Sequence, residues 1–381
     1  MFCLYCGQKL PNGSLFCCSC GKKQAYDTDD TPTSHPTPSA PQTDEFAELD
    51  AFFSNQVMEK RSREAEEERR IQEQKAAEER RLRLQEEQER ARLQAEQANQ
   101  ARIRAMFDIY GGSAHYKDKN APHRVVEIPE GITELSLGAF INCKNVERII
   151  IPNSVKRLGD SAFMGCSALQ EVILPESITE LGKSTFFQCT ALKRVVLPSA
   201  LTRIPDSCFH DCSALEKIEL PYGLQAIGKE AFQLCASLKE IAMPDTVTYL
   251  GASAFGGCKK LEIVVISDGL KSIPEFAFSC CSSIRFLNIP EGMTRVEKYA
   301  FRKCSALDHV NFPASLRRIE ESAFQNCSAL QSLDIFGAGL EAICTRAFDG
   351  CTSLKTAFLP EKTCVYSNAF PSTTKIWRRK M

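Results

Sequence analysis

Residues 169–191 read LQEVILPESITELGKSTFFQCTA, and this pattern recurs through the second part of the chain. Aligned on its cysteine, the repeat is L-x-x-V-x-L-P-x-x-(I/L)-x-x-(I/L)-G-x-x-A-F-x-x-C-x-x, with a step of 23 residues. A constant step of this size indicates a repeat array rather than a small disulfide-bonded domain. The recurring cysteines are Cys143, Cys166, Cys189, Cys212, Cys235, Cys258, Cys281, Cys304 and Cys327, followed after 24 residues by Cys351. The recurring phenylalanines are Phe140, Phe163, Phe186, Phe209, Phe232, Phe255, Phe278, Phe301, Phe324, Phe348 and Phe370.

The repeat unit resembles the BspA-like (Treponema-type) leucine-rich repeat, through its L-x-x-V-x-L core followed by A-F-x-x-C. The resemblance covers residues 120–375, about two thirds of the chain. Each repeat of such an array forms one coil of a solenoid, and its short strand lies beside the strands of neighbouring coils. The resemblance therefore implies a C-terminal leucine-rich-repeat solenoid of about 10–11 coils with a parallel β-sheet on its concave face.

The repeated cysteines are predicted to be buried, inert thiols. Stacked cysteines on adjacent coils would come near disulfide distance, but their parallel Cβ vectors would not converge as a disulfide requires. A buried free thiol behaves as a small hydrophobic side chain. Disulfides between coils are the alternative interpretation of this column.

The two outward positions of each strand are expected to form the concave face, and two apolar tracts occur among them. A contiguous apolar stripe on the exposed side of a solenoid favours a protein ligand. The alternative is that the β-propensity of Ile and Val explains these residues without any partner. The residues predicted to contact a partner are Ile150, Ile173, Val196, Ala242, Ile263, Val265 and Phe286.

The first 23 residues resemble the short N-terminal zinc ribbons found on many bacterial multidomain proteins. Two C-x-x-C-G knuckles, at residues 3–7 and 17–21, flank a Pro-Asn-Gly turn. Four thiolates at this spacing can close a tetrahedral site, and the bound metal would supply folding energy that so small a core lacks. Two disulfides are the alternative. The predicted ligands of one structural Zn²⁺ are Cys3, Cys6, Cys17 and Cys20, with Cys18 as a non-ligand.

Residues 24–43 are predicted to be a disordered linker, and residues 44–110 a long charged helix. The linker contains four prolines, whereas no Pro or Gly occurs from Asp44 to Phe107. Residues 59–93 hold 11 acidic and 11 basic side chains, and several acidic residues precede a basic residue by four positions, which is the favourable order in a helix. No heptad pattern of apolar residues persists, so a single spacer helix and a loose coiled-coil homodimer both remain open.

The ends of the solenoid carry two further expectations. Residues 103–110 are more apolar than the rest of the helix and are expected to dock on the solenoid, with Gly111 and Gly112 ending the helix. Residues 376–381 are expected to form a solvated basic tail in which Trp377 caps the last coil.

The composition argues against several classes of protein. With 47 basic and 48 acidic residues the net charge is -1, so the chain as a whole is not a strongly basic nucleic-acid binder. No apolar run is long enough to predict a membrane span, and no secretory signal is visible, so a cytoplasmic location is expected.

Three functions remain open from the sequence, none of them enzymatic. The five histidines form no metal-binding or nucleophile motif, and no phosphate-binding loop occurs. The first hypothesis is a protein-interaction scaffold, with the zinc ribbon as a second docking module. The second is a nucleic-acid-associated protein that acts through the ribbon. The third, implied by the BspA-like resemblance, is a cell-surface adhesin.

Overall fold

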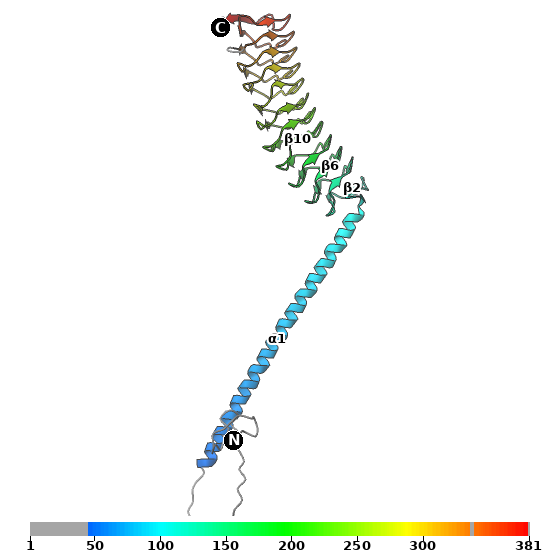
Figure 1. Cartoon of the computed structure of the whole chain (residues 1–381), viewed down its shortest axis with the longest axis vertical. Coiled ribbons are helices and arrows are strands. Elements are labelled where there is room, and N and C mark those ends of the chain that lie inside the picture. Colours follow the sequence, from blue (N-terminus) through cyan, green and yellow to red (C-terminus); the bar gives the residue numbers. More distant parts are fainter. Residues whose placement is uncertain (1–44, 336–338, 380–381) are drawn as a thin grey trace, which may run out of the picture. The chain divides into compact units, whose positions relative to one another are not determined.

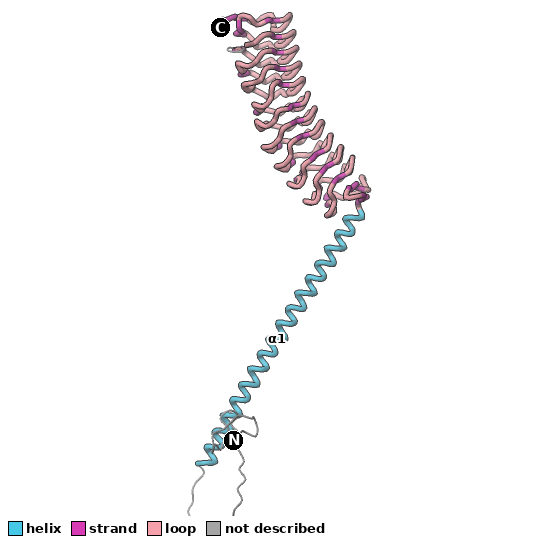
Figure 2. The backbone as a smooth tube through the Cα atoms, in the orientation of Figure 1, coloured by secondary structure: helices cyan, strands magenta, loops and turns pink. Residues whose placement is uncertain are grey.

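The structure, a computed structural model, describes residues 45–335 and 339–379. Its long helix and its repeat region are shown in Figure 1 and, by secondary structure, in Figure 2. The predicted zinc ribbon at residues 1–23 and the predicted linker at residues 24–43 lie outside the described residues. Among those that are described, no helix is long and apolar enough to cross a membrane.

Helix α1 runs from Glu45 to Ala105, over 61 residues, and confirms the prediction of one long charged helix. All of its side chains from residue 52 to residue 99 are exposed. Local ion pairs support it, as between Glu79 and Arg83 at 2.7 Å and between Arg69 and Glu73 at 3.4 Å. A rise of 1.5 Å per residue gives this helix a length of about 90 Å. The coiled-coil homodimer remains a prediction.

The helix ends five residues earlier than expected, because residues 107–110 are a strand. Strand β1 (Phe107–Tyr110) pairs antiparallel with β2 (Ser113–Tyr116). Gly111 and Gly112 turn this hairpin, with φ angles of 56° and 86°, instead of ending a helix. The buried ring of Phe107 lies edge-on to Tyr116 at 5.4 Å, so it closes the first coil of the repeat region.

The repeat region is a solenoid of about eleven turns in which each coil contributes one strand to each of two stacks. We call these stacks the long-strand sheet and the short-strand sheet, although each is divided along the solenoid into several hydrogen-bonded sheets. All pairings between its coils are parallel, and most join residues 23 apart, such as Val125 with Arg148. The long-strand sheet contains β3 (Val125–Glu127), β5 (Arg148–Ile150), β7 (Glu171–Ile173), β9 (Arg194–Val196), β11 (Lys217–Ile218), β13 (Glu240–Ala242), β15 (Ile263–Val265), β17 (Phe286–Asn288), β19 (His309–Asn311), β21 (Ser332–Asp334), β23 (Thr356–Pro360) and β25 (Lys375–Arg379).

The second sheet, the short-strand sheet, is built from two-residue strands that follow the long strands along the chain. Its first strand stacks on the β1–β2 hairpin through the pairing of β2 with β4. Its members are β4 (Glu134–Leu135), β6 (Arg157–Leu158), β8 (Glu180–Leu181), β10 (Arg203–Ile204), β12 (Ala226–Ile227), β14 (Tyr249–Leu250), β16 (Ser272–Ile273), β18 (Arg295–Val296), β20 (Arg318–Ile319), β22 (Ala342–Ile343) and β24 (Cys364–Val365).

The A-F-x-x-C segments form the third side of each coil and contain a continuous stack of aromatic rings. The stack begins at Tyr116, passes through every recurring phenylalanine and ends at Phe370, with centroid distances of 5.1–5.4 Å. The amide N–H of each Phe from Phe140 to Phe348 donates to a backbone carbonyl of the next coil at 2.6–2.8 Å. This stack, the phenylalanine ladder, therefore holds adjacent coils together through both side chains and backbone.

The recurring cysteines are free and fully buried beside the phenylalanine ladder, which confirms their prediction as buried thiols. The structure adds a polar role: from Cys166 to Cys351, each Sγ donates to the carbonyl oxygen of the Phe of the preceding coil at 3.0–3.2 Å. Burial raises the pKa of six of these thiols, to about 12 for Cys189 and likewise upward for Cys212, Cys235, Cys258, Cys304 and Cys327. They therefore stay protonated at neutral pH and keep this hydrogen bond.

Residues 376–379, predicted to be a solvated basic tail, are exposed but form a strand. Residues 375–379 form strand β25, which pairs in parallel with β23 over five positions. The backbone groups of β23 thereby gain partners, and Trp377 lies opposite Phe358 in register, with about half of its surface exposed. The guanidinium of Arg379 stands 4.9 Å from the centre of the Phe358 ring.

Candidate functional site: the outer surface of the long-strand sheet

The long-strand sheet presents two columns of side chains to solvent. In each three-residue strand the central side chain is buried and the two outer side chains point away from the core, as in β5, where Ile149 is buried and Arg148 and Ile150 are exposed. Alternation of this kind follows from the two-residue period of a strand. Because each coil repeats the arrangement, equivalent side chains stack into columns about 4.8 Å apart from coil to coil.

The first column is charged from β5 to β13, and its charges are matched within the sheet. Arg194 forms an ion pair with Glu171 of the preceding coil at 2.6 Å, and Lys217 pairs with Glu240 of the following coil at 3.1 Å. Side chains of opposite charge on neighbouring coils leave little net charge on this surface. A strongly charged ligand is therefore a poor fit for this part of the sheet.

Three predicted contact residues lie together in the second column, on adjacent strands. Ile150 of β5 and Ile173 of β7 are 43% and 57% exposed, and Val196 of β9 is partly buried beside them. A hollow of about 390 Å³ runs beside the first two, lined by residues that include Asn153 and Pro175. We call Ile150, Ile173 and Val196 the first apolar patch.

The other four predicted contact residues form a second apolar patch on β13, β15 and β17. Ala242 and Val265 occupy the second column, while Ile263 and Phe286 occupy the first. Ile263, Val265 and Phe286 are each at least half exposed. We define the second apolar patch as Ala242, Ile263, Val265 and Phe286.

Glu219, whose side chain is 85% exposed, lies between the two predicted apolar tracts. The sequence reasoning missed one feature of this surface. The Phe286 ring stacks on His309 of the next coil at 5.5 Å, which extends the second patch, and His309 Nε2 lies 3.0 Å from Asn311 Oδ1. The 23-residue spacing of Phe286 and His309 was the signal that would have placed them side by side.

Another hollow lies on the short-strand sheet, with a volume of about 650 Å³. Its lining includes Gly159, Gly182 and the alternating charges Glu134, Arg157, Glu180 and Arg203. Arg157 pairs with Glu180 at 3.1 Å. The mixed charges and the small residues give this hollow no cluster of apolar anchors comparable to the two patches.

The zinc site stays a prediction, because Cys3, Cys6, Cys17 and Cys20 lie outside the described residues. Within residues 45–335 and 339–379, no group of three or more His, Cys, Asp or Glu side chains is placed to hold a metal. The histidines of this part serve local contacts: His123 lies 2.9 Å from the Tyr116 hydroxyl, and His210 stacks on Phe187. None of these contacts arranges a nucleophile beside a base.

A family model matches most of the solenoid. The model described as the BspA type leucine rich repeat region matches the chain in three overlapping segments, residues 133–262, 202–331 and 271–378. No curated protein matches the chain. Together the three segments cover more than half of the 381 residues.

Several solved structures of leucine-rich repeat proteins are similar to this chain. The crystal structure of a leucine-rich repeat protein from Bacteroides ovatus is 23% identical, covering 72% of this chain and 69% of its own, with a TM-score of 0.57. The pneumococcal vaccine antigen PcpA is 19% identical, over 70% of this chain and 72% of its own, with a TM-score of 0.43. A leucine-rich repeat protein of T. pallidum is 24% identical, over 59% of this chain and 86% of its own, with a TM-score of 0.37. At 23% identity the likeness to the Bacteroides ovatus protein concerns the fold alone.

Proposed function

Because the chain belongs to the BspA-type leucine-rich repeat family, we propose that it is a non-enzymatic protein whose solenoid binds a protein partner. The contact surface in this proposal is the outer side of the long-strand sheet, through the two apolar patches. The helix acts as a spacer, and the N-terminal ribbon, loaded with one Zn²⁺, acts as a second docking module. A cytoplasmic location is part of the same proposal.

The second apolar patch is the observation that carries this proposal. Ile263 and Val265 of β15 and Phe286 of β17 expose 58%, 52% and 50% of their surfaces on neighbouring coils of the solenoid. Large apolar side chains scattered singly over a surface need no explanation, whereas a contiguous group marks an interaction site. Desolvating such a group on a preformed surface favours binding without the entropic cost of folding a segment.

A surface-adhesin role is the second candidate, and family membership supports it equally well. Both roles use the same binding surface and differ in where the protein resides. Fractionation of cells that express the tagged full-length chain separates them: recovery in the soluble fraction supports the scaffold, and accessibility to protease in intact cells supports the adhesin. Nucleic-acid binding through the ribbon predicts instead a salt-sensitive interaction that is lost on chelation of zinc.

The test of the proposed surface is a paired replacement of apolar residues by aspartate. The variant Ile263→Asp with Phe286→Asp places two charges in the second patch, and the control Tyr222→Asp with Tyr249→Asp changes two exposed aromatic residues outside it. Proteins that copurify with the wild-type chain after nuclease treatment are quantified for each variant. We expect the patch variant to lose a protein partner that the control retains, and equal retention by both variants would refute the proposed surface.

A further inference from the structure

One pair of arginines departs from the charge pattern of the short-strand sheet. The first residues of its early strands alternate in sign: Glu134, Arg157, Glu180, Arg203. Arg295 of β18 and Arg318 of β20, in contrast, have the same charge and lie directly opposite each other in the parallel pairing. Like charges on adjacent positions of neighbouring strands destabilise a sheet unless something compensates them.

The positive charges of Arg295 and Arg318 are not compensated by the residues at the equivalent position of the neighbouring strands, which we call their row. The strands on either side of the arginine pair place Ser272 and Ala342 at the equivalent position. Arg194 and Lys217 on the long-strand sheet are also neighbouring cations. Each of them forms an ion pair with a glutamate at the equivalent position of the flanking strand. The row of Arg295 and Arg318 therefore contains no carboxylate that could neutralise them from the side.

Two glutamates supply the counter-charge from behind the arginines, at a position that is glycine or proline in the preceding coils from Gly159 to Pro274. At Gly182 an added Cβ would collide with the backbone N of Asp160, so that coil admits no side chain there. The equivalent positions in the later coils hold Glu297 and Glu320, and then Cys344. Only Glu297 and Glu320 place a carboxylate at this position of the repeat.

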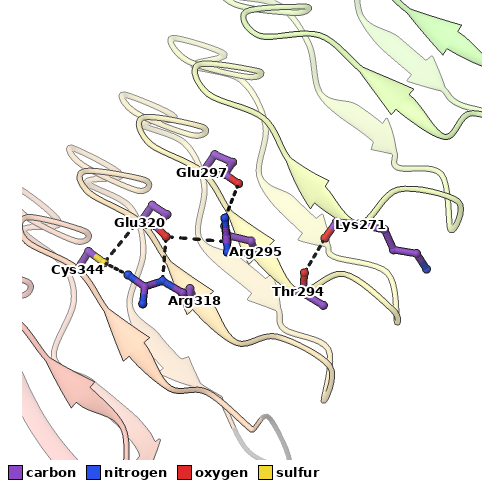
Figure 3. Close-up of polar contacts among 7 residues, drawn as sticks. All are labelled: Lys271, Thr294, Arg295, Glu297, Arg318, Glu320 and Cys344. Atoms are coloured by element: carbon purple, nitrogen blue, oxygen red, sulfur yellow. Dashed lines mark hydrogen bonds and ion pairs between the residues drawn. The ribbon is translucent and has the colours of Figure 1, made fainter.

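Glu320 holds both guanidinium groups by their inner edges (Figure 3). Its Oε1 accepts a hydrogen bond from Arg318 Nε at 2.9 Å and lies 4.0 Å from Arg295 Nε. Arg295 also pairs with Glu297 at 3.6 Å, and the Cys344 thiol donates to Glu320 Oε2 at 3.3 Å. The side chain of Glu320 is only 16% exposed, compared with 50% for Arg295 and 36% for Arg318.

The protonation states keep this arrangement charged. Burial by itself would raise the pKa of Glu320, but hydrogen bonds from Arg318 and Cys344 and the two guanidinium charges outweigh it, so the pKa lies below its usual range. Burial raises the pKa of the Cys344 thiol. Glu320 is therefore ionised, and Cys344 is a neutral donor, at neutral pH.

The arginines keep hydrogen-bonding capacity on their outer side. Among the described residues, no acceptor contacts Arg295 Nη2 or Arg318 Nη1. Lys271 is not part of this group, since Figure 3 shows its side chain directed away from both arginines. Two guanidinium groups on adjacent parallel strands, about 4.8 Å apart at the backbone, thus face solvent with their inner edges fixed.

We propose that Arg295 and Arg318 together bind a phosphoryl group. A carboxylate has two oxygens, which one guanidinium fork satisfies, whereas a phosphoryl group has three and can accept hydrogen bonds from two arginines at once. Glu320 acts as a positioning residue that prevents the like-charged arginines from swinging apart. The site lies on the short-strand sheet and does not depend on the apolar patches of the long-strand sheet.

The phosphoryl group has two possible sources, a phosphorylated side chain of a partner or a free phosphate ion. Titration of the full-length chain with inorganic phosphate and, separately, with a phosphoserine peptide and its unphosphorylated form distinguishes the two. Binding of either phosphate-bearing probe supports the site and identifies its source. Absence of binding by both probes, at concentrations of tens of millimolar for the free ion, would overturn the proposal.

Substitutions locate the binding. We expect Arg295→Gln and Arg318→Gln each to weaken binding roughly tenfold, because each removes one charge-assisted fork. Arg203→Gln is the matched control, since Arg203 occupies the same row and lies 3.9 Å from Asp206. Equal losses in the control and the test variants would contradict the site, as would wild-type binding by the double variant. Arg318→Lys keeps the charge but loses the guanidinium fork. Its affinity for the phosphate probe should therefore lie between those of the wild type and of Arg318→Gln.

A second readout uses the native thiols and requires no substitution. Cys344 lies 3.6 Å from Arg318 Nη2, whereas the exposed Cys364 is on β24. Bound phosphate should slow alkylation of Cys344 without changing that of Cys364, as measured by peptide mass spectrometry. Equal alkylation rates of Cys344 with and without a saturating probe would count against a ligand on Arg318.

Discussion

Phe232 in the solenoid and Leu82 in α1 are both large apolar residues, but the structure uses them in opposite ways. Phe232 is fully buried and stacks at 5.2 Å between Phe209 and Phe255, each 23 residues away. Leu82 is half exposed, on a helix whose ion pairs join residues four positions apart. The solenoid is therefore stabilised by contacts between coils and α1 by contacts within one turn. A rigid surface is expected only from the former.

Alkaline pH should separate the two regions most strongly, because only the solenoid contains the buried thiols. No cysteine occurs between residues 21 and 142. The folded-state pKa of a thiol such as Cys189, about 12, exceeds its ordinary value of 9.0. Stability from this difference is complete below pH 9 and is lost as the pH rises toward 12, at about 1.4 kcal/mol per thiol and pH unit. Circular dichroism should show the solenoid unfolding above about pH 10, with the helix signal retained; an unchanged solenoid at pH 11 would contradict this.

Truncation of one ring should give the next largest difference. Phe232→Ala leaves a cavity between two stacked coils and should cost about 3–5 kcal/mol of unfolding free energy. Leu82→Ala removes little buried surface and should change stability by less than about 0.5 kcal/mol. Urea unfolding measures both. A cost below about 1 kcal/mol for Phe232→Ala would show that the ladder does not hold the coils together.

Replacement of a thiol should have an intermediate effect. Cys235→Ser keeps a donor for the Phe209 carbonyl, 3.1 Å from Sγ, but it buries a more polar hydroxyl, and we expect a loss of about 1–3 kcal/mol. Cys364→Ser is the control, because Cys364 is exposed. Equal midpoints of urea unfolding for the two variants would show that the buried column tolerates polarity.

Exposed ion pairs should have the smallest effect, and here the two regions should behave alike. Glu171→Gln breaks the 2.6 Å pair with Arg194 between coils, and Glu79→Gln breaks the 2.7 Å pair with Arg83 within α1. Each loss should be about 0.2–1 kcal/mol at low salt. Both should shrink in 1 M NaCl, where screening is nearly complete at these distances. A loss that persists in 1 M salt would indicate a role other than charge pairing.

The parts of the fold that follow from the sequence are those in which many coils repeat the same requirement. The period of Phe163 and its equivalents predicts the solenoid, because every coil must place a ring at the same point. Short segments without such repetition were misjudged. The segment of residues 107–110 is too short for its apolar pattern to distinguish a helix from a strand. The strand is stabilised by contacts of the Phe107 ring with Tyr116 and Phe140.

The same contrast applies to the candidate sites. Residues such as Ile263 could be placed on the outer surface from their strand position alone. The stacking of Phe286 on His309 and the arrangement around Glu320 depend on side-chain contacts between coils that no single repeat reveals. A signal for the arrangement around Glu320 was present in the sequence, because residues 297 and 320 are glutamates at a position that is glycine or proline in the preceding coils from Gly159 to Pro274.

Site-specific photo-crosslinking in living cells tests the central claim, that the outer surface of the long-strand sheet binds a protein partner. A photoreactive phenylalanine analogue replaces Phe286 in the second apolar patch, Tyr249 on the short-strand sheet, or Leu82 on α1; all three positions are about half exposed. The account predicts a discrete crosslinked protein from Phe286 and none from Tyr249 or Leu82. A crosslink from Leu82 or Tyr249 with none from Phe286 would contradict it.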